Sequence, residues 1–78
     1  MVKEKVQLIF QDVFDDKNLL VTEGMSAADI EDWDSLGNID LIVAMENEFK
    51  VKFNIKDIQE LQNVGDMIRL IEKELAAK

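Results

Sequence analysis

The sequence predicts an all-α fold, a four-helix bundle with a short third helix and a long loop between helices one and two. Apolar residues recur at helical spacing in three separate segments. The chain has 78 residues, which leaves room for one hydrophobic core, so residues 1–78 are expected to form a single domain. It has no cysteine, so the fold must rest on packed helices rather than on disulfides.

The first helix is predicted from a single apolar stripe near the start of the chain. The members of this stripe recur at helical spacing and are Val2, Val6, Ile9, Phe10 and Val13. The helix is expected to stop near Asp15, Asp16 and Asn18, because these residue types favour a turn.

Residues 15–34 form a long connection, and a long loop in so small a domain is often functional. Met25, Ile30 and Trp33 are expected to anchor this loop to the core. Within it, the sequence SAAD at residues 26–29 predicts one capped helical turn.

The second helix, predicted within EDWDSLGNIDLIVAMENEF, has more apolar residues than one core-facing stripe needs. Placed around a helix at about 100° per residue, four of them form a face wide enough for the core: Leu41, Ile42, Met45 and Phe49. A second stripe, called the apolar strip below, lies roughly opposite and consists of Leu36, Ile39 and Val43.

A bundle of this size cannot easily cover both faces of one helix, so the apolar strip is expected to be at least partly exposed. Asp40, Glu46 and Asn47 border it. An exposed strip of this kind usually marks a partner site. The pattern alone also fits a helix buried on all sides, or dimerisation through the strip.

The last two helices are predicted downstream of residue 50. Residues 51–62, VKFNIKDIQELQ, alternate briefly and then place Ile55, Ile58 and Leu61 three apart, which predicts a short helix after an extended lead-in. The fourth helix is predicted from Val64, Met67, Ile68, Ile71 and Leu75. Asn63 is a good N-cap for it, and Asp66 would lie near the positive end of the helix dipole.

The chain is acidic, with 17 acids against 9 bases and a net charge of −8. Residues 29–48 contain seven acids and no base. Such a surface repels nucleic acid, attracts basic protein surfaces and, by self-repulsion, favours a monomer. A solvated acidic surface with no partner is the plainer interpretation of composition alone.

Membrane insertion and secretion are not predicted. The longest apolar run, residues 41–45, is far shorter than a membrane span, and MVKEKVQLIF is too charged for a secretion signal. A cytoplasmic location is expected.

Ser35 stands at the start of the second helix, where Asp34 or Ser35 could serve only as the N-cap. A serine nucleophile needs a base, and the chain has no histidine. The G-x-S-x-G motif fails because Trp33 occupies the first glycine position. The acids lack the spacing of a calcium loop, and the glycines are isolated. No catalytic residue and no metal site are therefore predicted.

Asp-Ser-Leu at 34–36, followed by IDLIVAMENEF, resembles the modification-site helix of acyl carrier proteins. NVGD at 63–66 is similar to the start of the family's fourth helix, with Asn63 where threonine is usual. Helix order, the long first loop and the acidic balance agree, so the resemblance covers nearly the whole chain.

The resemblance implies a non-catalytic carrier in fatty-acid, polyketide or related biosynthesis. A phosphopantetheinyl transferase would attach 4′-phosphopantetheine from coenzyme A to Ser35, and the arm would carry acyl or aminoacyl groups as thioesters. Loading and transferring enzymes with basic docking surfaces would bind at Asp34, Leu36, Ile39, Asp40, Val43 and Glu46.

Four residues depart from the pattern of fatty-acid-synthesis carriers: Trp33, Gly37, Asn38 and Asn47. The departures make the sequence more similar to stand-alone carriers of specialised pathways. Glycine near a helix start lowers helix propensity, so Gly37 suggests a close approach by another group. Two alternatives stay open: an unmodified acidic module that docks a basic partner through the apolar strip, and a carrier-like subunit held by one enzyme.

Overall fold

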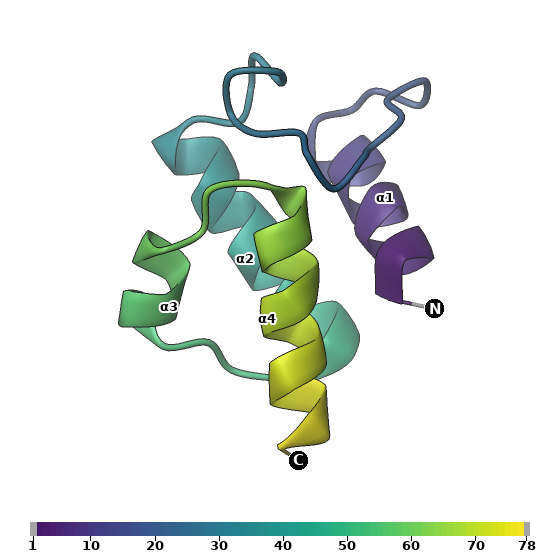
Figure 1. Ribbon diagram of the computed structural model, residues 1–78. Helices are drawn as coiled ribbons and strands as arrows, with labels where there is room; N and C mark the ends of the chain where they lie inside the picture. The colour runs from purple at the N-terminus through teal and green to yellow at the C-terminus, as the bar shows by residue number, and fades with distance from the viewer. Residues whose placement is uncertain (1, 78) are drawn as a thin grey trace.

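The computed structural model describes residues 2–77, and every regular element in them is helical (Figure 1). The helices are α1 (Val2–Val13), α2 (Ser35–Phe49), α3 (Ile55–Gln59) and α4 (Val64–Ala76). The prediction of four helices with a short third one and a long first loop is confirmed. Within the described range, no helix is long and apolar enough to cross a membrane.

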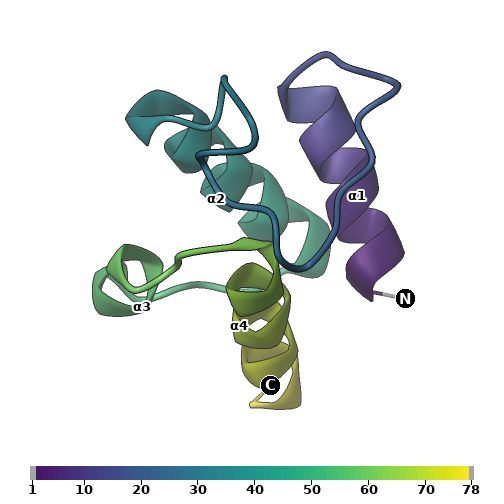
Figure 2. The ribbon, with the colours of Figure 1, turned by 45° about the horizontal axis from the view of Figure 1, so that its top comes forward.

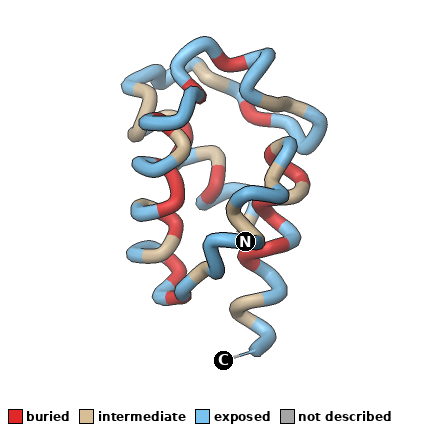
Figure 3. The backbone as a smooth tube through the Cα atoms, turned by 90° about the vertical axis from the view of Figure 1, so that its left-hand side faces the viewer, coloured by how far each residue is buried: buried red, intermediate tan, exposed pale blue. Residues whose placement is uncertain are grey.

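The three longer helices pack on one another, and α3 stands beside α2, away from α1 (Figures 1 and 2). Their inward faces carry the buried residues, as the tube coloured by burial shows (Figure 3). The core contains Val6, Phe10, Leu41, Ile42, Met45, Phe49, Val64, Met67, Ile68 and Ile71. The core faces predicted for α1, α2 and α4 are therefore confirmed.

The long loop is packed against the core rather than free in solvent. Ile30 and Trp33 are buried and Met25 is partly buried, as predicted; Val21 is a further buried anchor. Two hydrogen bonds between side chains and backbone cap the 26–29 turn. The Ser26 N–H donates to Asp29 Oδ2 (3.0 Å), and the Ala28 N–H donates to Ser26 Oγ (3.2 Å). These bonds confirm the single capped turn.

The loop is also tied to the helices on either side of it. Gln11 Nε2 of α1 donates to the Leu19 carbonyl at 2.8 Å. The first N–H groups of α4 have no partner within their own helix. Instead, Val64 donates to the Met25 carbonyl and Gly65 to the Glu23 carbonyl, both at 2.8 Å. The start of α4 therefore holds the middle of the loop in place.

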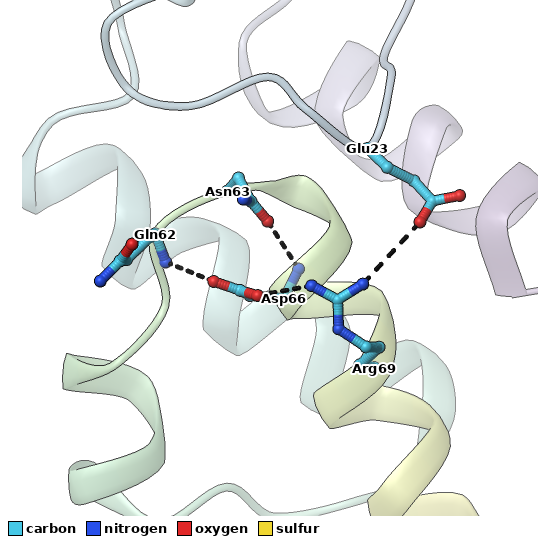
Figure 4. A network of polar contacts seen from close by, with 5 residues as sticks. All are labelled: Glu23, Gln62, Asn63, Asp66 and Arg69. Carbon is cyan, nitrogen blue, oxygen red and sulfur yellow. Dashed lines mark hydrogen bonds and ion pairs between the residues drawn. The ribbon is translucent and has the colours of Figure 1, made fainter.

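Side chains at the start of α4 complete this junction (Figure 4). Asn63 is the N-cap, as predicted, because its Oδ1 accepts from the Asp66 N–H at 2.8 Å. The Asp66 carboxylate accepts from Arg69 Nη2 (2.6 Å) and from the Gln62 N–H (3.1 Å). The hydrogen bond from Arg69 is the main cause that lowers the pKa of Asp66, and the Gln62 N–H adds to it.

The third helix differs in one respect from the spacing of its apolar residues. Ile58 and Leu61 pack against the core, but Ile55 is 74% exposed. The helix ends at Gln59, so Leu61 lies beyond it and Ile55 occupies its first position. A one-turn helix is too short for all three side chains to share one face.

Candidate functional site

At the start of α2, one residue caps the helix and the next residue keeps an unbonded hydroxyl. Asp34 is the N-cap, with Oδ1 accepting from the Gly37 N–H at 2.9 Å. Ser35 is the first residue of the helix and is exposed. Within residues 2–77 its hydroxyl makes no hydrogen bond. The helix start is therefore stabilised without Ser35, and the serine is available for chemistry.

Gly37 lets the long loop pass close to α2. A Cβ at this position would collide with the carbonyl oxygen of Asp32 and lie 3.0 Å from Cε1 of Phe14. The close approach suggested by the sequence is thus made by the loop's own backbone, on the side of α2 that faces α1.

Trp33 also contacts the N-terminal end of α2 and packs it against α1. Its indole is 7% exposed and meets the Phe10 ring edge-on, with the ring centroids 5.2 Å apart. Its Nε1–H donates to Asn38 Oδ1 at 3.0 Å. Trp33, Gly37 and Asn38, three separate departures in the sequence, are one packed unit around the start of the helix.

The Trp33–Asn38 bond was not predicted from the sequence. The available signal was chemical: a buried indole usually finds an acceptor for its N–H. Several polar side chains within five residues of Trp33 could have supplied that acceptor, and only the packing of the loop selects Asn38.

The apolar strip is exposed along α2. Leu36, Ile39 and Val43 are 74%, 58% and 50% exposed. Leu41 and Met45 on the opposite side are fully buried. The prediction of a core face and a free face is confirmed, and the alternative of a helix buried on all sides is wrong.

The predicted acidic border is uneven. Asp34 and Asp40 are exposed, whereas Glu46 is half-buried. Glu46 Oε2 accepts from the Phe53 N–H at 3.0 Å, which ties α2 to the segment that leads into α3. Glu46 therefore has a structural contact that the sequence did not reveal, and Asp40 is the freer charge beside the strip.

A groove of about 360 Å³ opens beside Ser35. Its walls come from the long loop, from the start of α2 and from the connection between α3 and α4. They include Ala27, Trp33, Ser35, Asn38, Leu61 and Gln62. Among the residues that the structure describes, no group of histidine, cysteine, aspartate or glutamate could hold a metal ion.

The chemistry available at Ser35 is that of an exposed hydroxyl at the N-terminus of a fifteen-residue helix. The positive end of the helix dipole lies there and favours a group that carries negative charge. The site fits covalent attachment of an anionic group.

Comparison with known families agrees with this chemistry. Residues 5–71 match the family model described as the phosphopantetheine attachment site. The chain belongs to the acyl carrier protein family. Acyl carrier proteins are non-catalytic carriers with a phosphopantetheine prosthetic group, and this chain is one of them.

Relatives from several bacteria support the assignment. The acyl carrier protein of Phenylobacterium zucineum is 34% identical over 76 residues, covering 97% of this chain and 96% of its own length. That of Thermotoga maritima is 40% identical over 55 residues, covering 70% of this chain and 68% of its own.

Solved structures show the same fold. The holo acyl carrier protein from Geobacter metallireducens superposes with a TM-score of 0.89 at 43% identity, covering 95% of this chain and 85% of the other. A putative acyl carrier protein from Mycobacterium tuberculosis gives 0.85 at 23% identity, covering 94% and 97%, and shows likeness of fold alone.

Proposed function

We propose that the hydroxyl of Ser35 is the attachment point of 4′-phosphopantetheine. The observation that supports this most directly is its position: exposed, free of hydrogen bonds within residues 2–77 and first in α2. The chain's other serine, Ser26, uses its hydroxyl oxygen to accept from the Ala28 N–H inside the loop turn. Ser35 is thus the serine whose oxygen is not already used.

In the attachment step, Ser35 Oγ bonds to the phosphorus that carries the pantetheine half of coenzyme A. The adenosine bisphosphate half leaves, and the hydroxyl proton passes to a base on the phosphopantetheinyl transferase. The product is a phosphodiester anion at the helix N-terminus, where the dipole stabilises it. When bound, the arm supplies a terminal thiol that carries acyl or aminoacyl groups as thioesters.

The partner enzymes are proposed to dock along α2. The surface consists of the apolar strip and the acids beside it: Asp34, Leu36, Ile39, Asp40, Val43 and Glu46. The partners are the transferase and the loading and transferring enzymes, with basic docking surfaces. Charges at the rim accelerate encounter more than they tighten binding, which suits a carrier that visits many enzymes.

The pathway is proposed to be a specialised one rather than housekeeping fatty-acid synthesis. The support is the Trp33, Gly37 and Asn38 unit, which departs from the fatty-acid-synthesis pattern and organises the start of α2. Cytoplasmic location, a monomeric state and a single domain over residues 1–78 stay predictions.

The test is intact mass after incubation with coenzyme A and a broad-specificity phosphopantetheinyl transferase. The wild type and the matched control Ser26→Ala should each gain one phosphopantetheine, and Ser35→Ala should gain none while folding normally, since Asp34 provides the cap. Modification of Ser35→Ala would overturn the attachment site.

No gain in a folded wild-type sample would contradict the proposal and favour the unmodified docking module. The rival of a carrier-like subunit predicts stoichiometric co-purification with one enzyme, whereas a mobile carrier should purify alone.

A further inference from the structure

The groove beside Ser35, called the Trp33 groove below, brings three segments of the chain together at the proposed attachment point. Ala27 and Trp33 come from the long loop, Asn38 from the first turn of α2, and Leu61 from the connection after α3. Its volume of about 360 Å³ is near the lower end for small-molecule sites. The groove has room for a slender ligand.

The hydrogen bond from Trp33 fixes the orientation of the Asn38 amide. An indole N–H can only donate, so the carbamoyl oxygen of Asn38 must face it, at 3.0 Å. The Nδ2 group, with two N–H donors, therefore points away from the indole. Among the described residues it has no acceptor, and Asn38 is partly exposed on the groove wall.

Asn38 and Ser35 lie on the same face of α2. They are three positions apart, and side chains at this spacing on a helix are neighbours, with Cβ atoms about 5–6 Å apart. A group joined to Ser35 Oγ thus begins one helical turn from a pair of oriented, unused donors. Gln62 also lines the groove, and its side-chain amide is directed away from Asp66 (Figure 4).

We propose that the Trp33 groove is the resting site of the phosphopantetheine arm. The Asn38 Nδ2–H donates to an amide carbonyl of the arm, and Trp33 and Leu61 contact its apolar part. The inference rests on the proposed attachment at Ser35 and adds the residues that hold the arm between visits to enzymes.

Chemical complementarity supports this occupant. The arm alternates amide groups with short apolar stretches, and the groove is lined both by side-chain amides and by an indole and a leucine. The hydrogen bond from Asn38 is neutral and reaches a partly exposed site, so it is weak enough to release the arm to a docked enzyme.

The test is NMR spectroscopy of the apo protein and of the same protein after modification. Trp33 is the chain's one tryptophan, so its indole N–H resonance is unambiguous. In the modified protein, the resonances of this N–H and of the Asn38 side-chain amide should shift. Nuclear Overhauser contacts should join the arm's methyl groups to the Trp33 ring.

Asn38→Asp is the matched variant, because a carboxylate still accepts from the Trp33 indole but has no N–H to donate. It should be modified by the transferase yet lose the contacts between arm and indole. Asn47→Asp makes the same change at an exposed position of α2 outside the groove and should keep them.

The outcomes separate the two proposals. A gain in mass at Ser35 without shifts or contacts at Trp33 and Asn38 would overturn the groove and leave the carrier function intact. Contacts retained in Asn38→Asp would overturn the role of the amide. Failure of a folded wild type to gain mass would overturn the attachment site, and the groove inference with it.

Discussion

At the scale of single residues, the N-cap of α2 and the proposed attachment point are two adjacent residues, Asp34 and Ser35. Asp34 satisfies the Gly37 N–H at 2.9 Å, and Ser35 is left with an unbonded hydroxyl. A serine used as the cap would have its oxygen engaged by a backbone N–H and would be a poorer acceptor of the arm. The Asp-Ser order therefore keeps the reactive position free without weakening the helix start.

Gly37 gives the residue-scale prediction. Gly37→Ala should lower the free energy of unfolding by about 1–3 kcal/mol, since overpacking a filled site has this typical cost. The new methyl group would meet the backbone carbonyl of Asp32, which cannot rotate away as a side chain can. Urea denaturation measures the effect.

Gly24→Ala is the control for that variant. Nothing lies within 4 Å of a Cβ at Gly24, so its stability should be unchanged or slightly raised. Equal stability of the two variants would show that the Asp32 carbonyl is not a barrier to a side chain at Gly37.

At the scale of elements, α2 presents one face to the core and another to partners. The apolar strip is at least half exposed at each of its three positions. Its acidic neighbours are not equivalent, because Glu46 is bonded to the Phe53 N–H and Asp40 is free in solvent. A test of charge steering should therefore alter Asp40 alone, since a change at Glu46 would also disturb the lead-in to α3.

Asp40→Lys should slow modification by the transferase at low ionic strength. The expected cause is loss of electrostatic attraction to a basic docking surface, which salt screens beyond roughly 8 Å at 0.15 M. Initial rates at rising salt concentration measure the effect, and the difference from wild type should shrink with salt. Glu4→Lys makes the same charge change on the exposed surface of α1. Its rate of modification should be closer to that of wild type than the rate of Asp40→Lys. Identical rates for the two variants at low salt would remove the steering argument.

The start of α4 is a second element with a testable charge. The pKa of Asp66 is lowered from 3.8, chiefly by the hydrogen bond from Arg69. A carboxyl whose folded pKa is depressed contributes stability above its unfolded pKa and loses it as the pH falls through the folded value. The difference in free energy of unfolding between wild type and Asp66→Asn should therefore be constant above about pH 5. It should become smaller below pH 3.8.

Urea denaturation across this pH range, read as the difference between the two proteins, isolates Asp66 from the other acids. If the difference in free energy of unfolding between the two proteins grew as the pH fell, the lowered pKa of Asp66 would be contradicted. The effect is expected to be small, because Arg69 is exposed and solvent screens the pair.

At the scale of the whole molecule, the long loop connects the helices into one unit. It is bonded to α1 through Gln11 and to the first N–H groups of α4, and Trp33 carries it into the core beside Phe10. Because the loop, the three longer helices and the groove share these contacts, they are expected to unfold together.

Urea unfolding should accordingly be a single transition. Trp33 fluorescence reports the loop and the core, and far-ultraviolet circular dichroism reports the helices. The two midpoints should coincide, as two-state unfolding of a small domain requires. Separate midpoints would contradict a single domain over residues 1–78.

The sequence was sufficient to predict the helix order, the core faces, the exposed apolar strip and the capping residues Asn63 and Ser26. All of them depend on local rules: helical periodicity, short-range capping and the small core that 78 residues allow. The Asp-Ser-Leu motif also places the candidate attachment point, because a reactive serine at a helix start is a feature of neighbouring residues.

Only the tertiary structure decided how the rest is used. It joined Trp33 to Asn38, set the Asp32 carbonyl against Gly37 and bonded Glu46 to Phe53. The groove beside Ser35 exists because residues near 27, 33 and 61 converge there. Periodicity and motifs specify which face of a helix is buried, but the path of a long loop depends on packing between distant residues, and that path builds the surroundings of the serine.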